Sequence, residues 1–505
     1  MNQEKEYQKE LKNIAKYGGI NFFGIFFVNL MGYVINIIIA RNIAVEQLGQ
    51  FVLSMRIITY LGMLSLLGFN ATSIRYISKY FALNKHSELM GTMKFIVKWV
   101  AITSIILTTV TYFLSPFITD KIFHKPEISN ILRVLLITVP LVAISKMLYF
   151  NLRGLKLIKY EIISSKFIEP IARLLLLITF FYFGYKLSGL IAVQIIIPFF
   201  SLTYAAFFLY TKYLKTSATT NLTVHKKELL SFSLPIYLKS FVNNTSEMIP
   251  MYLMGIFIST REIGIFHICS KVSILVAISL TSFNVIIAPI VSSLFAKNDK
   301  ATMKKLLKVT TKWIITISLA IFFSILIYSE TILSIFGKEY IAGKNLLLII
   351  MFGQMINVFS GSNGLILNMS GRSKLMLKNS IISFVITVVS AHFLIPKYGA
   401  VGAALAIAIN ISVINTIKFY QVLILEKMHP YKWNFWKPIL AGIVSYIIVY
   451  YYSVSIDVSK MVNLLSGLII FTLIFALILI ILKFDEDDKI IFAAIKKRIG
   501  KGDNT

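Results

Sequence analysis

The chain has 505 residues, 57% hydrophobic and only 14% charged, with a mean hydropathy of +0.78. These proportions exclude an ordinary soluble globular protein, in which about half of the residues are apolar and about a quarter are charged. The net charge of +29 would suit a nucleic-acid-binding protein, but the basic residues gather on one predicted side of a membrane, so we expect no nucleic-acid partner.

Apolar runs recur along the chain, each long enough to cross a hydrocarbon core about 30 Å thick. They predict an all-α integral membrane protein with about 14 transmembrane helices. The predicted spans are 17–40, 46–70, 91–115, 129–151, 160–183, 187–211, 229–257, 264–292, 311–335, 341–367, 377–396, 398–424, 436–454 and 461–482. The segment before the first span does not read as a cleavable signal peptide. Cys269 is the one cysteine, so we expect no intramolecular disulfide.

Basic residues between the spans alternate from rich to poor. The rich segments are the N-terminus, 71–98, 152–159, 212–227, 297–312, 372–378, 427–437 and the C-terminal tail. Since Lys and Arg are retained on the cytoplasmic side, this pattern places both termini in the cytoplasm. We expect a multi-pass protein of the cell inner (cytoplasmic) membrane.

The two halves of the chain are similar in sequence. EQLGQFVLSMRI, from Glu46, aligns with REIGIFHICSKV at an offset of 215, which pairs Gly49 with Gly264 and Arg56 with Lys271. The repeat predicts two six-helix lobes related by a pseudo-twofold axis along the membrane normal, plus two C-terminal helices. The predicted parts are the N-lobe at 1–217, the C-lobe at 218–428, helices 13 and 14 at 429–484 and a cytoplasmic tail at 485–505.

Several segments carry a resemblance to a known family. GFNATSIRYISKY after the second span, LLSFSLPIYL, EIGIFHICSK and YGAVGAALAIAI resemble the polysaccharide transporters of the multidrug/oligosaccharidyl-lipid/polysaccharide flippase superfamily, and most closely Wzx-type O-antigen or capsule repeat-unit flippases. The resemblance implies a V-shaped, two-lobed alternating-access carrier similar to the multidrug exporters of that superfamily. It also implies a polyprenyl-pyrophosphate-linked oligosaccharide as the cargo, moved from the inner to the outer leaflet.

The resemblance also bears on two residues of the central path. Relatives that flip the cell-wall precursor carry arginines on helices 2 and 8, and Arg56 and, less closely, Lys271 match those positions. Multidrug exporters often carry an acid in helix 1 for ion coupling, and helix 1 here has none, which disfavours drug efflux.

Ionisable residues inside the spans are candidate site residues, because a charge at bilayer depth costs at least about 2.5–3.5 kcal/mol and normally faces protein or water. A planar guanidinium donates two parallel hydrogen bonds to a phosphate. Polar stripes on several spans would suit sugars. The predicted pyrophosphate or glycan ligands are Arg56, Lys271, Lys146, Lys239, Arg173, Asn29 and Asn243, and the ion-coupling candidates are Glu247 and Glu169.

Structural alternatives for these residues stay open. Arg56 could pair with Glu247 or Glu169, and the lysines near span ends could extend toward the interface. Lys166, Glu169 and Arg173 share one helix face and could neutralise one another. Asparagines in spans often join helices.

The sequence carries no pattern of an enzyme. It has no Gly-rich phosphate loop and no histidine pair at metal-ligand spacing, so we expect neither cofactor nor metal. Short predicted outer loops disfavour a glycan polymerase or ligase. We therefore predict a flippase for surface polysaccharide biosynthesis, with the lipid bilayer and polysaccharide polymerase or assembly proteins as further partners. The alternatives are a multidrug antiporter and a cell-wall precursor (lipid II) flippase.

Overall fold

A computed structural model describes residues 24–214, 222–456 and 458–483. Within these ranges the regular elements are all helices, which confirms the all-α prediction. Eleven of the described helices are long and apolar enough to cross a membrane. The predicted spans 160–183 and 229–257 also coincide with helical segments, although these are not among the eleven. The total of 14 spans is therefore consistent with the structure and stays a prediction.

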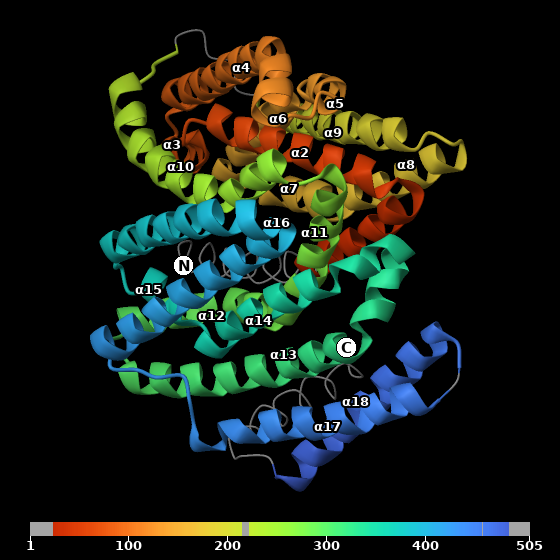
Figure 1. Cartoon of the computed structure of the whole chain (residues 1–505). Coiled ribbons are helices and arrows are strands. Elements are labelled where there is room, and N and C mark those ends of the chain that lie inside the picture. Colours follow the sequence, from red (N-terminus) through yellow and green to blue (C-terminus); the bar gives the residue numbers. More distant parts are fainter. Residues whose placement is uncertain (1–23, 215–221, 457, 484–505) are drawn as a thin grey trace, which may run out of the picture. The chain divides into compact units, whose positions relative to one another are not determined.

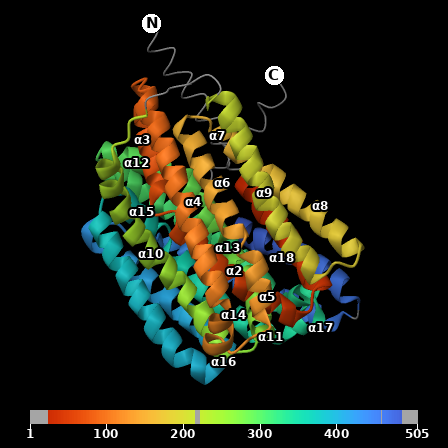
Figure 2. The same cartoon turned by 90° about the horizontal axis from the view of Figure 1, so that it is seen from above.

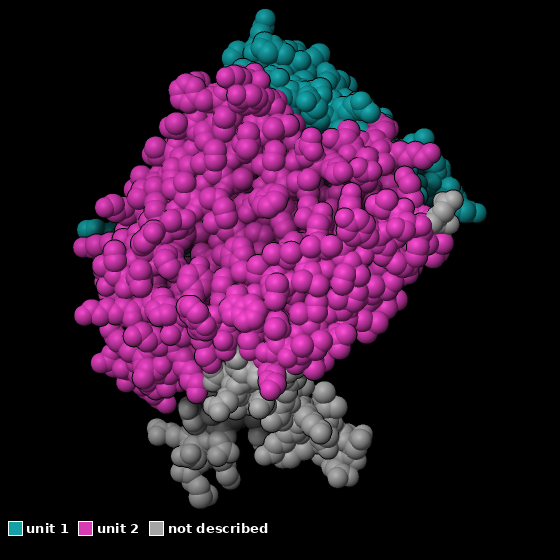
Figure 3. Space-filling view, turned by 60° about the horizontal axis from the view of Figure 1, so that its bottom comes forward, with its two compact units in different colours: residues 1–267 teal, residues 268–505 magenta. Residues whose placement is uncertain are grey.

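The described chain divides into two compact units, Met1–His267 and Ile268–Thr505 (Figure 3). The lobe boundary at residue 217, which rests on the sequence repeat, stays a prediction. Helices of the first unit are Gly24–Asn42, α2 (Val45–Ser65), α3 (Phe69–Ala82), α4 (His86–Pro116), η1 (Phe117–Ile122), α5 (Ile128–Leu135), α6 (Thr138–Gly154), α7 (Ile158–Ile163), η2 (Ser164–Ile168), α8 (Glu169–Tyr182), α9 (Leu187–Lys212) and α10 (Lys226–Phe257).

The helix α11 (Thr260–Ser273) begins in the first unit and continues into the second. Helices of the second unit are η4 (Ile274–Ala277), α12 (Ile278–Ala296), α13 (Lys300–Phe336), η5 (Lys338–Gly343), α14 (Lys344–Ser360), α15 (Asn363–Met369), α16 (Ser373–Leu425), η6 (Trp433–Phe435), α17 (Trp436–Ser455) and α18 (Lys460–Ile481). Gly399 interrupts α16 with φ 57° and ψ −133°, a conformation open to glycine, so the predicted spans 377–396 and 398–424 meet at this kink.

Two glycines matched by the repeat pack against each other where α2 crosses the start of α11. A Cβ atom added to Gly49 would lie 1.7 Å from the carbonyl oxygen of Thr260, and one added to Gly264 would lie 2.4 Å from that of Val45. Val45 and Thr260 are themselves 215 residues apart, so each half of the repeat makes the same contact with the other. The crossing thus has the local twofold character that the repeat predicts.

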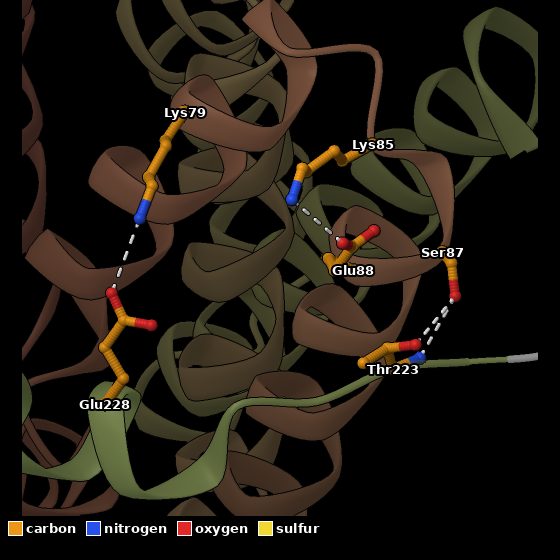
Figure 4. Close-up of polar contacts among 6 residues, drawn as sticks. All are labelled: Lys79, Lys85, Ser87, Glu88, Thr223 and Glu228. Carbon is orange, nitrogen blue, oxygen red and sulfur yellow. Dashed lines mark hydrogen bonds and ion pairs between the residues drawn. The ribbon is translucent and has the colours of Figure 1, made fainter.

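The connection into α10 is attached to the first turn of α4 (Figure 4). Thr223 donates its N–H to Ser87 Oγ at 3.1 Å, and the two hydroxyl oxygens lie 3.2 Å apart. Lys79 on α3 forms an ion pair with Glu228 on α10 at 3.5 Å. These contacts hold the start of α10 beside α3 and α4 within the first unit.

The last two helices pack on α13 of the second unit (Figure 1). Tyr328 of α13 donates a hydrogen bond to Asn463 at 3.2 Å, and a Cβ added to Gly467 would lie 1.7 Å from the same phenol oxygen. Phe471 and Phe475 stack beside this contact in a buried apolar cluster. A small residue on α18 thus permits close packing, as is typical between membrane helices.

Candidate functional site

The first unit contains a polar cavity of about 510 Å³. Its walls are mainly α6, the segment from α7 through η2 to α8, and α9, and Figure 2 shows α8 and α9 running beside each other. The charged and amide side chains that line it are Lys146, Arg153, Glu161, Lys166, Glu169, Arg173 and Gln194. The volume falls in the range of about 300–1,000 Å³ that is typical of small-molecule sites.

The wall formed by η2 and α8 has two chemically different faces. Ile171, Leu175 and Ile178 recur at helical spacing and are exposed, whereas Glu169 and Arg173 line the cavity. The preceding π-helical turn ends at Ile168 and continues directly into α8, in which Pro170 is the second residue. The amphipathic pattern thus presents apolar side chains outward and charges inward.

Hydroxyl and amide groups hold two of the charged residues in the cavity. Ser164 donates a hydrogen bond to Glu169 at 3.0 Å, and Tyr149 donates to Ser164 at 2.7 Å. Arg173 donates from Nη1 to the side-chain oxygen of Gln194 at 2.5 Å. Neutral groups therefore orient both the carboxylate and the guanidinium.

The cavity bases make no close ion pair with the carboxylate of Glu169. Among the described residues no ion pair joins Lys166 or Arg173 to Glu169, and Lys146 has no hydrogen-bond or ion-pair partner. Lys146 is exposed to the open cavity. Glu169 is nevertheless close enough to Arg173 and Lys146 to interact electrostatically, so the alternative of a self-neutralising cluster on this helix face stays open.

Arg56 lies outside this cavity, half-buried on α2. It is close enough to Tyr252 of α10 to interact electrostatically. One turn further along, the Tyr60 hydroxyl lies 3.0 Å from the hydroxyl of Thr245, also on α10. This face of α2 is therefore directed at α10.

The other predicted site residues are placed differently or are not described. Lys239, Asn243 and Glu247 lie on α10, and their side chains fall outside the described residues. Lys271 is half-buried on α11 and belongs to the second unit, so its pairing with Arg56 stays a prediction. Asn29 is exposed on the helix Gly24–Asn42.

Several polar residues that form contacts in the structure were not among the predicted site residues. Gln194 binds Arg173 in the cavity, and it is the one amide side chain in the predicted span 187–211. Lys418 is half-buried on α16, near a reciprocal amide pair in which Asn379 and Gln421 each donate to the other at 2.7 Å. The rule that an ionisable residue inside a span is a candidate would have included Lys418.

A metal site is not apparent in the described part of the chain. The described residues contain no group of three or more His, Cys, Asp or Glu side chains arranged to hold a metal ion. The chemistry of the cavity is that of hydrogen bonding and charge.

The arrangement of helices is similar to that of solved membrane transporters. The lipid II flippase MurJ in an inward closed conformation superposes with a TM-score of 0.71 at 15% identity, over 90% of this chain and 97% of that one. An inward-facing multidrug resistance MATE family transporter superposes with a TM-score of 0.64 at 14% identity, over 79% and 94% of the two chains. These likenesses show that the chain has the fold of these two membrane transporters.

The chain belongs to the polysaccharide biosynthesis protein family, whose model matches residues 14–295, more than half of its length. The MatE model matches residues 235–393. The capsular polysaccharide biosynthesis protein CapF of Staphylococcus aureus is 24% identical over 258 residues, 50% of this chain and 65% of that protein. The probable low-salt glycan biosynthesis flippase Agl15 of Haloferax volcanii is 27% identical over 169 residues, 33% of this chain and 35% of its own length. The matched part is therefore less than two thirds of either relative.

Proposed function

We propose that this protein is an alternating-access flippase that moves a polyprenyl-pyrophosphate-linked oligosaccharide from the inner to the outer leaflet for surface polysaccharide biosynthesis. The observation that carries the proposal is the family match over residues 14–295. Membrane-spanning helices and a charged cavity fit a carrier of an amphiphilic cargo. The polyprenyl chain remains in lipid while the protein shields the polar head.

The predicted pyrophosphate ligands in the central path are Arg56 and Lys271, which occupy matched positions of the repeat. Each lies seven residues, about 10 Å along its helix, after a glycine of the α2 and α11 crossing. A guanidinium binds a pyrophosphate through parallel charge-assisted hydrogen bonds that strengthen where water is scarce. Glu247 and Glu169 remain our candidates for coupling transport to an ion.

We predict that the double variant Arg56→Ala and Lys271→Ala lowers surface-glycan export by about tenfold or more, because the charge-assisted bonds lost amount to at least about 1.5–3 kcal/mol. Export is measured as surface glycan per cell after normalising to membrane-inserted protein. Lys186→Ala is the matched control, since Lys186 is an exposed base between α8 and α9. Normal export by the double variant at normal protein levels would exclude the two residues as cargo ligands.

A lipid II flippase is the second candidate, favoured by the structural match to MurJ. The two functions differ in the consequence of losing the gene. Depletion of a sole lipid II flippase stops growth, whereas depletion of a capsule or O-antigen flippase removes a surface polymer from living cells. A multidrug exporter, favoured by the MatE match, would instead restore drug resistance to an efflux-deficient host.

A further inference from the structure

The cavity of the first unit carries more positive than negative charge. Lys146, Lys166 and Arg173 share the cavity with one carboxylate that forms no close ion pair, that of Glu169. At one end of the cavity Arg153 is neutralised by Glu161, to which it donates from Nε at 2.9 Å and from Nη2. Three bases and one acid leave an excess of two positive charges.

An excess of like charge in a cavity walled by membrane-spanning helices raises the local electrostatic potential. A cavity lined by charges of one sign attracts ions of the opposite sign. Tyr149 donates to Ser164, Ser164 donates to Glu169 and Gln194 accepts from Arg173. Among the described lining residues the one further acid, Glu161, is paired with Arg153. The charge pattern therefore favours an anion as the ligand of the cavity.

We infer that this cavity is a binding site for a diphosphate headgroup, separate from the proposed central path at Arg56; the inference rests on the proposed function and extends it. A diphosphate esterified at both ends carries two negative charges near neutral pH, which equals the excess in the cavity. Two ammonium groups and one guanidinium supply donors for its oxygens. The cavity volume of about 510 Å³ holds a compact anion with adjoining sugar and excludes a long glycan.

The outer face of α8 offers an apolar surface for the lipid part of such a ligand. Arg153 lines one end of the cavity, and Lys146 lies seven residues away on the same helix, α6, about 10 Å along its axis. An anion bound by Lys146 would therefore lie about 10 Å inside the cavity from Arg153. On the opposite face of α8, the exposed side chains of Ile171, Leu175 and Ile178 form an apolar strip. A polyprenyl chain fits that strip, while its headgroup occupies the charged face.

The site has a mechanistic consequence for the proposed transport cycle. Every described residue that lines it belongs to the first unit. The first unit would therefore bind the headgroup through its own residues.

The test uses the purified full-length protein in lipid nanodiscs, with binding of farnesyl pyrophosphate measured by calorimetry. This probe is a monoester and carries about one more negative charge than the diphosphate diester of the proposed cargo. We expect the double variant Lys146→Gln and Lys166→Gln to weaken binding by about tenfold or more, and the exposed-site control Lys186→Gln to leave it unchanged. We expect Glu169→Gln to tighten binding several-fold, because it removes the opposing charge. A loss of folding cannot produce that gain.

Two further ligands distinguish a site for a lipid-linked diphosphate from a site for a free anion. Inorganic pyrophosphate that binds as tightly as farnesyl pyrophosphate would identify a site for the free anion, and farnesol that competes equally would overturn the role of the phosphates. Unchanged affinity in both charge variants would overturn the cavity site while leaving the proposed function intact. Glycan export that persists without the protein would instead reject the proposed function, whatever the binding result.

Discussion

Charged residues of this chain serve distinct purposes that their identities alone do not reveal. Lys125 is buried and donates hydrogen bonds to the carbonyl oxygens of Gly255 at 2.5 Å and Phe123 at 3.2 Å, and burial lowers its pKa. It fixes a connection to the end of α10. Lys146, by contrast, is exposed to an open cavity and makes no such bond among the described residues. The first lysine is structural, whereas the second is available to a ligand.

Asp299 provides a prediction at the scale of one residue. Its carboxylate caps α13 by accepting the N–H of Thr302 at 3.0 Å, and this bond holds its pKa below the ordinary value of 3.8. A lowered pKa in the folded state means that the stabilisation is present above about pH 4 and is lost as the pH falls through the folded value. We predict that Asp299→Ala speeds amide exchange in residues 300–303 several-fold at pH 7, measured against intrinsic rates at each pH.

The matched variant for this cap is Asp299→Asn, because asparagine also caps helices and does not titrate. Its exchange rates should remain near those of the wild type at pH 7 and change little in acid. Equal protection in the wild type and in Asp299→Ala at neutral pH would show that the cap contributes nothing.

At the scale of helices, close approach depends on small residues at particular crossings. The α2 and α11 crossing leaves no space for a side chain at Gly49 or Gly264, whereas a Cβ added to Gly62, also on α2, would meet nothing within 4 Å. Two glycines in the same helix therefore have opposite roles. At Gly49 the absent side chain permits packing, while at Gly62 it only adds backbone freedom in the unfolded chain.

We predict that Gly49→Ala lowers the thermal midpoint of the purified protein, since overpacking typically costs about 1–3 kcal/mol. Gly62→Ala is the matched control and should leave the midpoint unchanged or raise it slightly, because alanine in a helix is favoured over glycine by up to about 1 kcal/mol in the free energy of folding. The midpoint is measured by fluorescence-detected unfolding in detergent. A similar midpoint for both variants would mean that α2 and α11 do not cross so closely in the membrane.

At the scale of the whole molecule, the distribution of basic residues predicts the orientation in the membrane. The helix α9 has 26 residues and is therefore about 39 Å long, which is enough to cross the bilayer. Lys186 precedes it in a base-poor connection, and Lys212 ends it at a base-rich one. The positive-inside rule places Lys186 outside and Lys212 inside.

Cysteine labelling tests this orientation in a background that lacks the native thiol. Cys269 is buried, and Cys269→Ala removes its residual reactivity. We predict that a membrane-impermeant maleimide applied to intact cells, with access through any outer envelope, labels Lys186→Cys and leaves Lys212→Cys unlabelled until the membrane is opened. The reverse pattern would invert the predicted topology, and labelling of both would show that α9 does not span.

The amino-acid sequence by itself determined the membrane class and the helical fold, because the length of an apolar run is a local property of a chain, and the resemblance of several segments pointed to the family. The co-facing of Lys166, Glu169 and Arg173 followed from helical periodicity. Only the tertiary structure decided that these residues share a cavity with Lys146 of α6 and Gln194 of α9, because helix packing determines which faces meet. It likewise decided that Gly49 and Gly264, paired in the sequence repeat, lie against each other, since the distance between matched residues is a property of the folded chain.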